Sequence, residues 1–316
     1  MKVLVTPTSL RPDKPSPALE KLQAFANDII YNPYGRPLTQ EELIELLPGC
    51  DGYIAGLDYV DASVIAACDK LRVISRYGAG VDRVDLAAAK EKGITVCNTP
   101  GANAQAVADL TLGLILAVAR KIPVLDADVR AGGWRRSTGV ELYGKTIGIL
   151  GLGAIGKAVA KRAQGFSMKV LAYDPYMDQA YAAEHDITST TIDQIVREAD
   201  VICLHLPYMP ETRHIISGEL MSKMKKGVII INTSRGGLID EDAAAVLLES
   251  GHLGGLGLDA FEVEPVGETP LSAFDNVVLT PHTAAHTHEA TANMANMAVQ
   301  NLIDVLSGQE CPYVIR

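Results

Sequence analysis

Three residues of types that could carry acid–base chemistry follow apolar runs in the second half of the chain: Arg235, Glu264 and His282. An arginine presents a planar fork that matches a carboxylate and keeps its charge. A histidine exchanges a proton near neutral pH, and a neighbouring carboxylate favours its charged form and fixes its ring. Reduction of a 2-oxo acid needs these three roles: a cation for the substrate, a proton donor beside the carbonyl oxygen, and a group that keeps the donor charged.

A glycine-rich turn, Gly151-Leu-Gly-Ala-Ile-Gly156, lies between an apolar run (145–150) and an amphipathic stretch (155–164). A dinucleotide site requires this order of strand, turn and helix. The first glycine permits the tight turn, the second lets a pyrophosphate approach the backbone, and the third lets the helix pack on the strand. Taken alone, the motif also fits a simple glycine-rich turn. We predict that the cofactor binds to Gly151, Gly153, Ala154, Ile155 and Gly156.

An acidic residue, Asp174, ends the next apolar run, 169–173, about 20 residues beyond the glycines. Its carboxylate would accept hydrogen bonds from the adenosine ribose and repel a 2′-phosphate, so we expect NAD rather than NADP. The alternative is an acid that only caps the loop before Pro175.

Composition limits the class of protein. The chain has 316 residues, 48% of them hydrophobic, and a formal net charge of −10. This size allows one large or two ordinary domains, and the negative charge argues against nucleic-acid or anionic-membrane partners. The five scattered cysteines form no CxxC pair and fit buried thiols without disulfides. With no secretory signal pattern in the sequence, we expect a cytoplasmic protein.

Strand-like and helical segments alternate along the chain, which predicts an α/β fold with doubly wound parallel sheets. A capping box at 39–42 begins one of the helices, and residues 191–194 cap another. A long buried helix is expected over 102–119 with Asn103 as its N-cap, and a final helix over 288–306. The expected strands are 2–6, 53–55, 71–75, 94–97, 145–150, 169–173, 201–206, 228–232, 255–259 and 277–280.

Each of the three reactive residues belongs to a short sequence motif that follows an expected strand: Asn232-Thr-Ser-Arg-Gly-Gly237, Asp259-Ala-Phe-Glu-Val-Glu-Pro265 and Thr280-Pro-His282. With the glycine turn and Asp174, these motifs resemble the D-isomer-specific 2-hydroxyacid dehydrogenase family over nearly the whole chain. The resemblance implies that Arg235 binds substrate, that His282 is the general acid or base, and that Glu264 orients and charges His282.

The resemblance also implies two Rossmann/flavodoxin-like domains, with an NAD-binding domain (99–285) inserted into a substrate-binding domain (1–98 and 286–316). A homodimer formed through the arm 122–143 is expected as well. One loop begins with Arg76, Tyr77, Gly78 and Ala79, and its backbone groups would bind the substrate carboxylate. Arg235 and His282 would bind the substrate as well. The cofactor would further be lined by Pro207, Thr212, Thr233 and Asp259. Ala284 departs from the glycine common beside the nicotinamide.

The motifs are most similar to those of short members resembling D-3-phosphoglycerate dehydrogenase. Arg76 and Arg136 match positions that bind the substrate phosphate in that enzyme. Ala55-Gly56, however, replaces an arginine–serine pair that is expected to contact the phosphate. Glyoxylate or hydroxypyruvate reduction is therefore the main alternative, because it needs only the carboxylate site. An NAD-sensing binding protein is a further alternative. No metal is expected, although His282, His286 and His288 could form a cluster if two of them shared a helix face.

Overall fold

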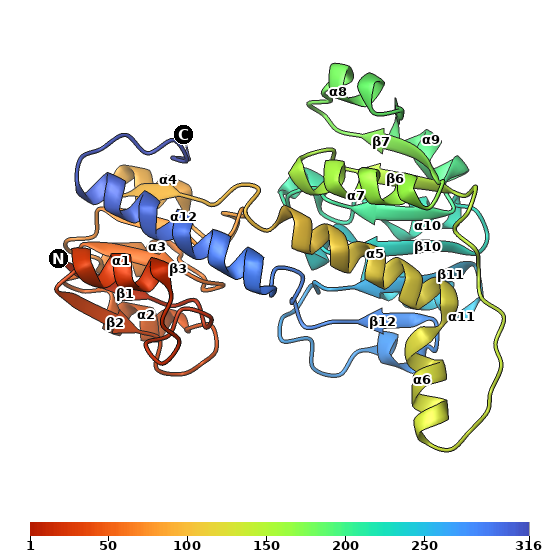
Figure 1. The fold of residues 1–316 in the computed structure, drawn as a ribbon, viewed down its shortest axis with the longest axis horizontal. Coiled ribbons are helices and arrows are strands. Elements are labelled where there is room, and N and C mark those ends of the chain that lie inside the picture. The colour runs from red at the N-terminus through yellow and green to blue at the C-terminus, as the bar shows by residue number, and fades with distance from the viewer. Residues whose placement is uncertain (316) are drawn as a thin grey trace. The chain divides into compact units, whose positions relative to one another are not determined.

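A computed structural model describes residues 1–315, and the chain divides into two compact units. The first unit contains Met1–Asn103 and the C-terminal residues from His286 onward, and the second contains Ala104–Ala285 (Figure 1). The sequence predicts the first boundary just before Thr99. In the structure the second unit begins a few residues later, where its first helix begins at Ala104.

The first unit is a five-stranded parallel sheet in the order β2-β1-β3-β4-β5, which is the flavodoxin-like order. Helices α2 (Gln40–Leu46), α3 (Ala62–Ala67) and α4 (Leu86–Glu91) pack on one face, and α1 (Pro17–Phe25) and α12 (His288–Leu306) on the other. The strands are β1 (Lys2–Val5), β2 (Asp28–Tyr31), β3 (Gly52–Ala55), β4 (Val73–Arg76) and β5 (Thr95–Cys97).

The second unit is a seven-stranded parallel sheet in the order β12-β11-β10-β9-β6-β7-β8. Helices α5 (Ala104–Arg120), α7 (Ala154–Gly165) and α8 (Gln179–Glu184) lie on one face, and α9 (Ile192–Glu198), α10 (Gly218–Ser222) and α11 (Glu241–Glu249) on the other. Its strands are β6 (Thr146–Leu150), β7 (Lys169–Tyr173), β8 (Ile187–Ser189), β9 (Val201–Leu204), β10 (Val228–Asn232), β11 (Leu253–Leu258) and β12 (Val277–Leu279). The prediction of two doubly wound parallel sheets is confirmed.

The chain order reverses in the second sheet between β6 and β9, which are neighbours. Doubly wound sheets bind their ligands at such a switch point, at the carboxyl ends of the strands. The loops after β6, β9, β10, β11 and β12 therefore meet at the edge where a ligand is expected. The remaining elements are α6 (Ile122–Arg130) and the 3₁₀ turns η1 (Pro210–Thr212), η2 (Gly236–Leu238) and η3 (Pro270–Ala273).

Polar side chains begin several of the helices, as the sequence predicts. Thr39 and Glu42 form the complete capping box of α2, and the Thr191 side chain accepts from the N–H of Gln194 at the start of α9. The prediction for Asn103 is wrong. Its Oδ1 is buried and has no hydrogen-bond partner among the described residues, so it does not cap α5.

Two short edge strands, β2 and β8, are absent from the predicted set, and α12 has the predicted bounds. All five cysteines are buried. None of the helices in residues 1–315 combines the length and apolar character needed to cross a bilayer.

Candidate active site

The three glycines of the turn after β6 differ in what surrounds them. Gly151 has φ +100°, and a Cβ atom there would lie 2.5 Å from the carbonyl oxygen of His205. A Cβ on Gly156 would lie 2.0 Å from the carbonyl oxygen of Gly151, whereas one on Gly153 would meet nothing within 4 Å. The first and third glycines thus allow close backbone packing. The second leaves open space at the N-terminus of α7, where free N–H groups favour an anion.

Asp174 follows β7 and binds the glycine turn. Its Oδ2 accepts a hydrogen bond from the N–H of Leu152 at 2.7 Å, and its Oδ1 accepts from the N–H of Tyr176 at 2.8 Å. The carboxylate is half-buried, so part of it faces solvent at the carboxyl edge of the sheet. It therefore links the ends of β6 and β7 at the place predicted for the adenosine ribose.

Glu264 and His282 form a close pair. Nδ1 of His282 lies 2.9 Å from Oε1 and 3.0 Å from Oε2 of Glu264. Because an ionised carboxylate only accepts hydrogen bonds, this geometry assigns a proton to Nδ1. Oε1 of Glu264 also accepts from the N–H of Phe261 at 3.2 Å. Both side chains are largely buried, with exposed fractions of 24% for His282 and 19% for Glu264, so solvent screens the pair only partly.

The turn that carries His282 is held by the buried carboxylate of Asp259. Oδ1 accepts from the Thr280 hydroxyl at 2.6 Å and from the N–H of Thr283 at 2.8 Å, and Oδ2 accepts from the N–H of Ala284 at 2.9 Å. His282 itself has φ +50°, a left-handed conformation that is uncommon for residues other than glycine. Three hydrogen bonds to one carboxylate stabilise this backbone and fix the direction of the imidazole.

Arg235 follows β10 and precedes η2. The side-chain amide of Asn232 donates to the carbonyl oxygen of Arg235 at 2.7 Å, and Nη1 of Arg235 donates to the carbonyl oxygen of Ser234 at 2.8 Å. A Cβ on the next residue, Gly236, would lie 1.8 Å from the backbone carbon of Phe261. Only glycine permits this approach. The backbone segments that carry Arg235 and Glu264 are therefore packed against each other.

The other predicted cofactor residues of this unit lie at the same sheet edge. Thr212, in η1, donates through its hydroxyl to the carbonyl oxygen of Pro207 at 2.8 Å and shapes the loop after β9. Thr233, just after β10, lies with its hydroxyl 2.9 Å from that of Thr111 in α5. At the start of α7, Ala154 is exposed and Ile155 is partly buried.

One residue of this edge was not singled out from the sequence. His205 follows β9, and both of its ring nitrogens are buried without a hydrogen-bond partner among the described residues, although other atoms of the residue keep some exposure. Burial lowers the pKa of His205 to about 3, so the ring is neutral. Its position directly after an apolar strand was the available signal, but one histidine in that position does not predict burial.

The predicted substrate residues of the first unit lie at the carboxyl end of β4. The buried Arg76 donates from Nη1 to the carbonyl oxygen of Ala55 at 2.7 Å and from Nε to that of Gly80 at 3.1 Å. The Tyr77 hydroxyl accepts from Ser9 and donates to the carbonyl oxygen of Thr291, each at 2.9 Å. The carbonyl oxygens of Gly78 and Ala79 accept from the Thr99 N–H and the Asn98 side chain. The loop is thus held from several sides.

The histidine cluster considered as a metal site lacks the helix it would need. Helix α12 begins at His288, so His282 and His286 precede it and do not share its face. Within residues 1–315, no group of three or more histidine, cysteine, aspartate or glutamate side chains could hold a metal ion.

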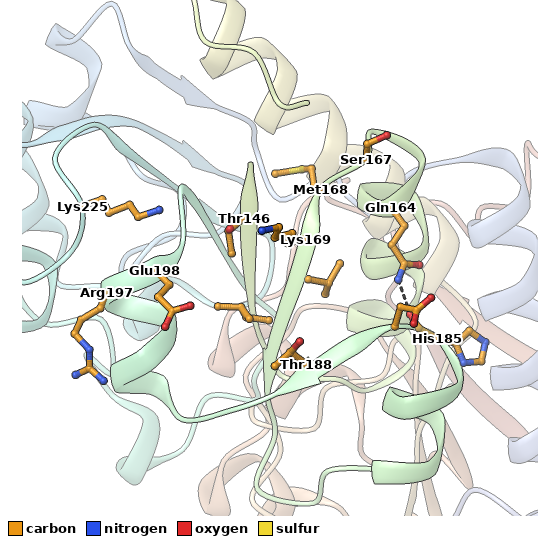
Figure 2. A pocket seen from close by; sticks show the side chains of 13 residues that line it. Thr146, Gln164, Ser167, Met168, Lys169, His185, Thr188, Arg197, Glu198 and Lys225 are labelled. Atoms are coloured by element: carbon orange, nitrogen blue, oxygen red, sulfur yellow. Dashed lines mark hydrogen bonds between the residues drawn. The ribbon is translucent and has the colours of Figure 1, made fainter. Parts of the chain in front are cut away.

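The second unit also has a cavity of about 840 Å³, and Figure 2 shows the side chains that line it. Thr146 and Lys169 line it from the amino ends of β6 and β7, opposite the glycine turn. Basic and acidic side chains both line it, so it has no single charge preference: Lys169, Arg197 and Lys225 stand with Asp186 and Glu198.

Comparison with known proteins gives a consistent match. The model of the D-isomer specific 2-hydroxyacid dehydrogenase NAD-binding domain matches residues 112–284. The D-3-phosphoglycerate dehydrogenase of Methanocaldococcus jannaschii is 43% identical over 88% of this chain, which spans about half (54%) of that relative's length. The glyoxylate reductase of Thermofilum pendens is 40% identical over 95% of this chain and 91% of its own length. The crystal structure of the TT0316 protein from Thermus thermophilus is 38% identical with a TM-score of 0.88, and the match covers 100% of both chains.

Proposed function

This chain belongs to the D-isomer specific 2-hydroxyacid dehydrogenase family, and from that membership we propose that it transfers a hydride between NAD and C2 of a D-2-hydroxy acid or 2-oxo acid. The observation that carries the proposal is the His282–Glu264 pair, held by Asp259 at the same sheet edge as the glycine turn. D-3-phosphoglycerate, with phosphohydroxypyruvate as its oxidised form, is the first substrate candidate.

The residues of the second unit fit a dinucleotide. The open space at Gly153 and the twelve-residue helix α7 behind it are suited to a pyrophosphate. In this proposal the Asp174 carboxylate would accept hydrogen bonds from the adenosine ribose. We assign cofactor contacts to Gly151, Gly153, Ala154, Ile155, Gly156, Asp174, Pro207, Thr212, Thr233 and Asp259. When bound, NAD supplies or accepts the hydride.

His282 is the proton donor or acceptor in this proposal. Its Nδ1 is bonded to Glu264, which leaves Nε2 to exchange a proton with the C2 oxygen of the substrate. In reduction, Nε2–H protonates this oxygen while C2 gains a hydride, and the 2-oxo acid becomes a 2-hydroxy acid. Glu264 stabilises the imidazolium that gives up the proton, and oxidation runs the same steps in reverse.

The remaining roles concern substrate binding. We assign to Arg235 the polarisation of the substrate carbonyl and binding of its carboxylate, because a guanidinium donates two parallel hydrogen bonds and keeps its charge. We assign carboxylate binding also to the backbone of the loop formed by Arg76, Tyr77, Gly78 and Ala79, which the surrounding hydrogen bonds keep in place.

One part of the first unit favours the second candidate, reduction of glyoxylate or hydroxypyruvate. A Cβ on Gly56 would lie 3.2 Å from the nitrogen of Pro7 and 3.4 Å from Oδ2 of Asp58, so this position is confined and has a carboxylate beside it. The N–H of Gly56 already donates to Asp58 at 3.1 Å. The Arg76 guanidinium is engaged by two backbone carbonyls. These features do not favour a phosphate at this site.

The test is NADH oxidation by the purified protein with phosphohydroxypyruvate, hydroxypyruvate and glyoxylate side by side, repeated with NADPH. Preference for phosphohydroxypyruvate supports the first candidate, and preference for the other two acids supports the second. His282→Ala should reduce kcat by roughly two to four orders of magnitude and leave NADH binding intact. If the unmodified protein binds NADH but turns over no 2-oxo acid, an NAD-sensing role is favoured instead.

We also propose a homodimer in the cytoplasm. No residue of α6 is buried, and Ile122 and Val129 on it expose about half of their surface, at 51% and 54%. Trp134, in the segment that follows, is 85% exposed. Apolar side chains exposed together are typical of an interface. Light scattering coupled to size-exclusion chromatography should give the mass of a dimer, and Trp134→Glu should shift it toward the monomer.

A further inference from the structure

The segment that carries Glu264 is held from outside by a second glutamate. Glu241 is the first residue of α11, and Asp240 caps this helix by accepting from the N–H of Ala243 at 3.0 Å. Since Asp240 supplies the cap, the Glu241 carboxylate takes another partner. Its Oε1 accepts from the backbone N–H of Glu262 at 2.8 Å, and Glu262 lies in the chain between Phe261 and Glu264.

The same short segment is fixed at two further points. The Glu262 carboxylate accepts from Nε2 of His214 at 3.0 Å, and the backbone of Phe261 is packed against Gly236. Inside the segment, the N–H of Phe261 donates to Oε1 of Glu264, which also binds Nδ1 of His282. A shift of the backbone at Glu262 would therefore move the carboxylate that orients the imidazole.

We propose that Glu241 is a positioning residue: its carboxylate fixes the Phe261–Glu264 segment and so keeps Glu264 in the place that orients His282. The inference rests on the proposed function, because the loss it predicts is a loss of proton transfer. Glu241 does not touch the reacting atoms in this proposal and acts only through Glu262 and Glu264.

Folding makes the negative charge of Glu241 less favourable, and the hydrogen bond to Glu262 does not require that charge. Burial raises the pKa of Glu241, as do its acidic neighbours Glu262, Asp242 and Glu264, while the N–H of Glu262 lowers it. Ionisation of Glu241 is therefore less favourable in the folded protein than in the unfolded chain. A glutamine would accept the same hydrogen bond without the charge. Glu241→Gln thus tests the hydrogen bond separately from the charge.

The experiment compares three variants with a control. Glu241→Ala removes the acceptor and should lower kcat about tenfold while the KM for NADH stays within twofold, because cofactor contacts are unchanged. Glu241→Gln keeps an acceptor of the same length and should restore most of kcat. Glu241→Asp keeps the charge but is one methylene shorter, so it should fall between them and remains informative if the alanine variant folds poorly. Asp242→Ala, which removes an exposed acid from the same helical turn, should leave kcat unchanged.

A second readout does not depend on activity. In the cofactor-free protein with ¹⁵N-labelled histidine, the ring signal of His282, assigned by its loss in His282→Asn, should shift or broaden in Glu241→Ala and not in Glu241→Gln or Asp242→Ala. An unmoved signal together with unchanged kcat in Glu241→Ala would overturn the proposal, as would equal losses in all four variants. If the unmodified protein reduces no 2-oxo acid, the proposed function fails, and the His282 signal still decides whether Glu241 positions Glu264.

Discussion

The carbonyl oxygen of Gly151 occupies the space beside Gly156, where a Cβ atom would lie 2.0 Å from it. This contact joins the first turn of α7 to the end of β6. Gly153, between them, faces open space. The three glycines of one motif thus have separable purposes, two in packing and one in ligand approach, and substitutions can distinguish them.

Gly156→Ala should destabilise the second unit by about 1–3 kcal/mol, since the added methyl group must displace backbone. Gly153→Ala should leave the unfolding midpoint in urea unchanged and weaken NADH binding roughly tenfold or more, equivalent to about 1.4 kcal/mol. Fluorescence titration with NADH and urea unfolding of both variants measure the two effects. Unchanged NADH affinity in Gly153→Ala would contradict the assignment of Gly153 to the cofactor, and equal stability loss in the two variants would contradict the separation of packing from ligand approach.

Asp174→Ala should weaken NAD binding about 10- to 100-fold and narrow the preference for NAD over NADP, because the ribose loses a charged acceptor worth about 1.5–3 kcal/mol. The same carboxylate binds the N–H groups of Leu152 and Tyr176, so part of the loss will come from a looser turn. Asp174→Asn keeps one acceptor oxygen and should retain more affinity for NAD. Kd values for both cofactors check this, and unchanged selectivity would show that another residue discriminates between them.

Arg235→Lys should lower kcat/KM for the 2-oxo acid about 10- to 100-fold, because a point charge replaces a planar fork and roughly 1.5–3 kcal/mol of charge-assisted hydrogen bonding is lost. The backbone around position 235 is fixed by Asn232 and by the close approach of Gly236 to Phe261, so the variant should fold normally. Steady-state kinetics with NADH saturating would show the effect. An unchanged kcat/KM would remove the substrate role proposed for Arg235.

The sequence predicted the parts of the site that depend on residue type and on strand ends. The purposes of Gly151 and Gly156 followed from their spacing, and the structure supports them. The pairing of Glu264 with His282 was implied by the family resemblance, and the expected strand ends placed both residues at the same edge of the sheet. Thr39 predicted its helix start because a capping box is a local interaction.

What the sequence did not predict depends on distant contacts. The strands β2 and β8 are short and lie at sheet edges, so each depends on pairing with a single neighbouring strand. Asn103 has the right type for a cap, but its Oδ1 is buried and has no hydrogen-bond partner among the described residues. Glu241 looks like an ordinary acid in a first helical turn, and only the fold brings it to the N–H of Glu262, 21 positions along the chain.

His205 should make the protein sensitive to acid. Burial lowers the pKa of His205 to about 3, below its ordinary value of 6.5, so the folded state favours the neutral ring. The unfolded chain binds a proton more readily, and the stability contributed by the neutral ring is complete above pH 6.5 and declines as the pH falls toward 3. The decline is about 1.4 kcal/mol per pH unit, or about 2 kcal/mol between pH 6.5 and pH 5.

His205→Asn cannot gain this proton. Urea unfolding should therefore show that the stability difference between the unmodified protein and His205→Asn shrinks by about that amount on going from pH 7 to pH 5. His185→Asn is the control, since that ring is only partly buried and stacks on Tyr181. A difference that stays constant with pH would mean that the His205 ring is accessible to protons in the folded state.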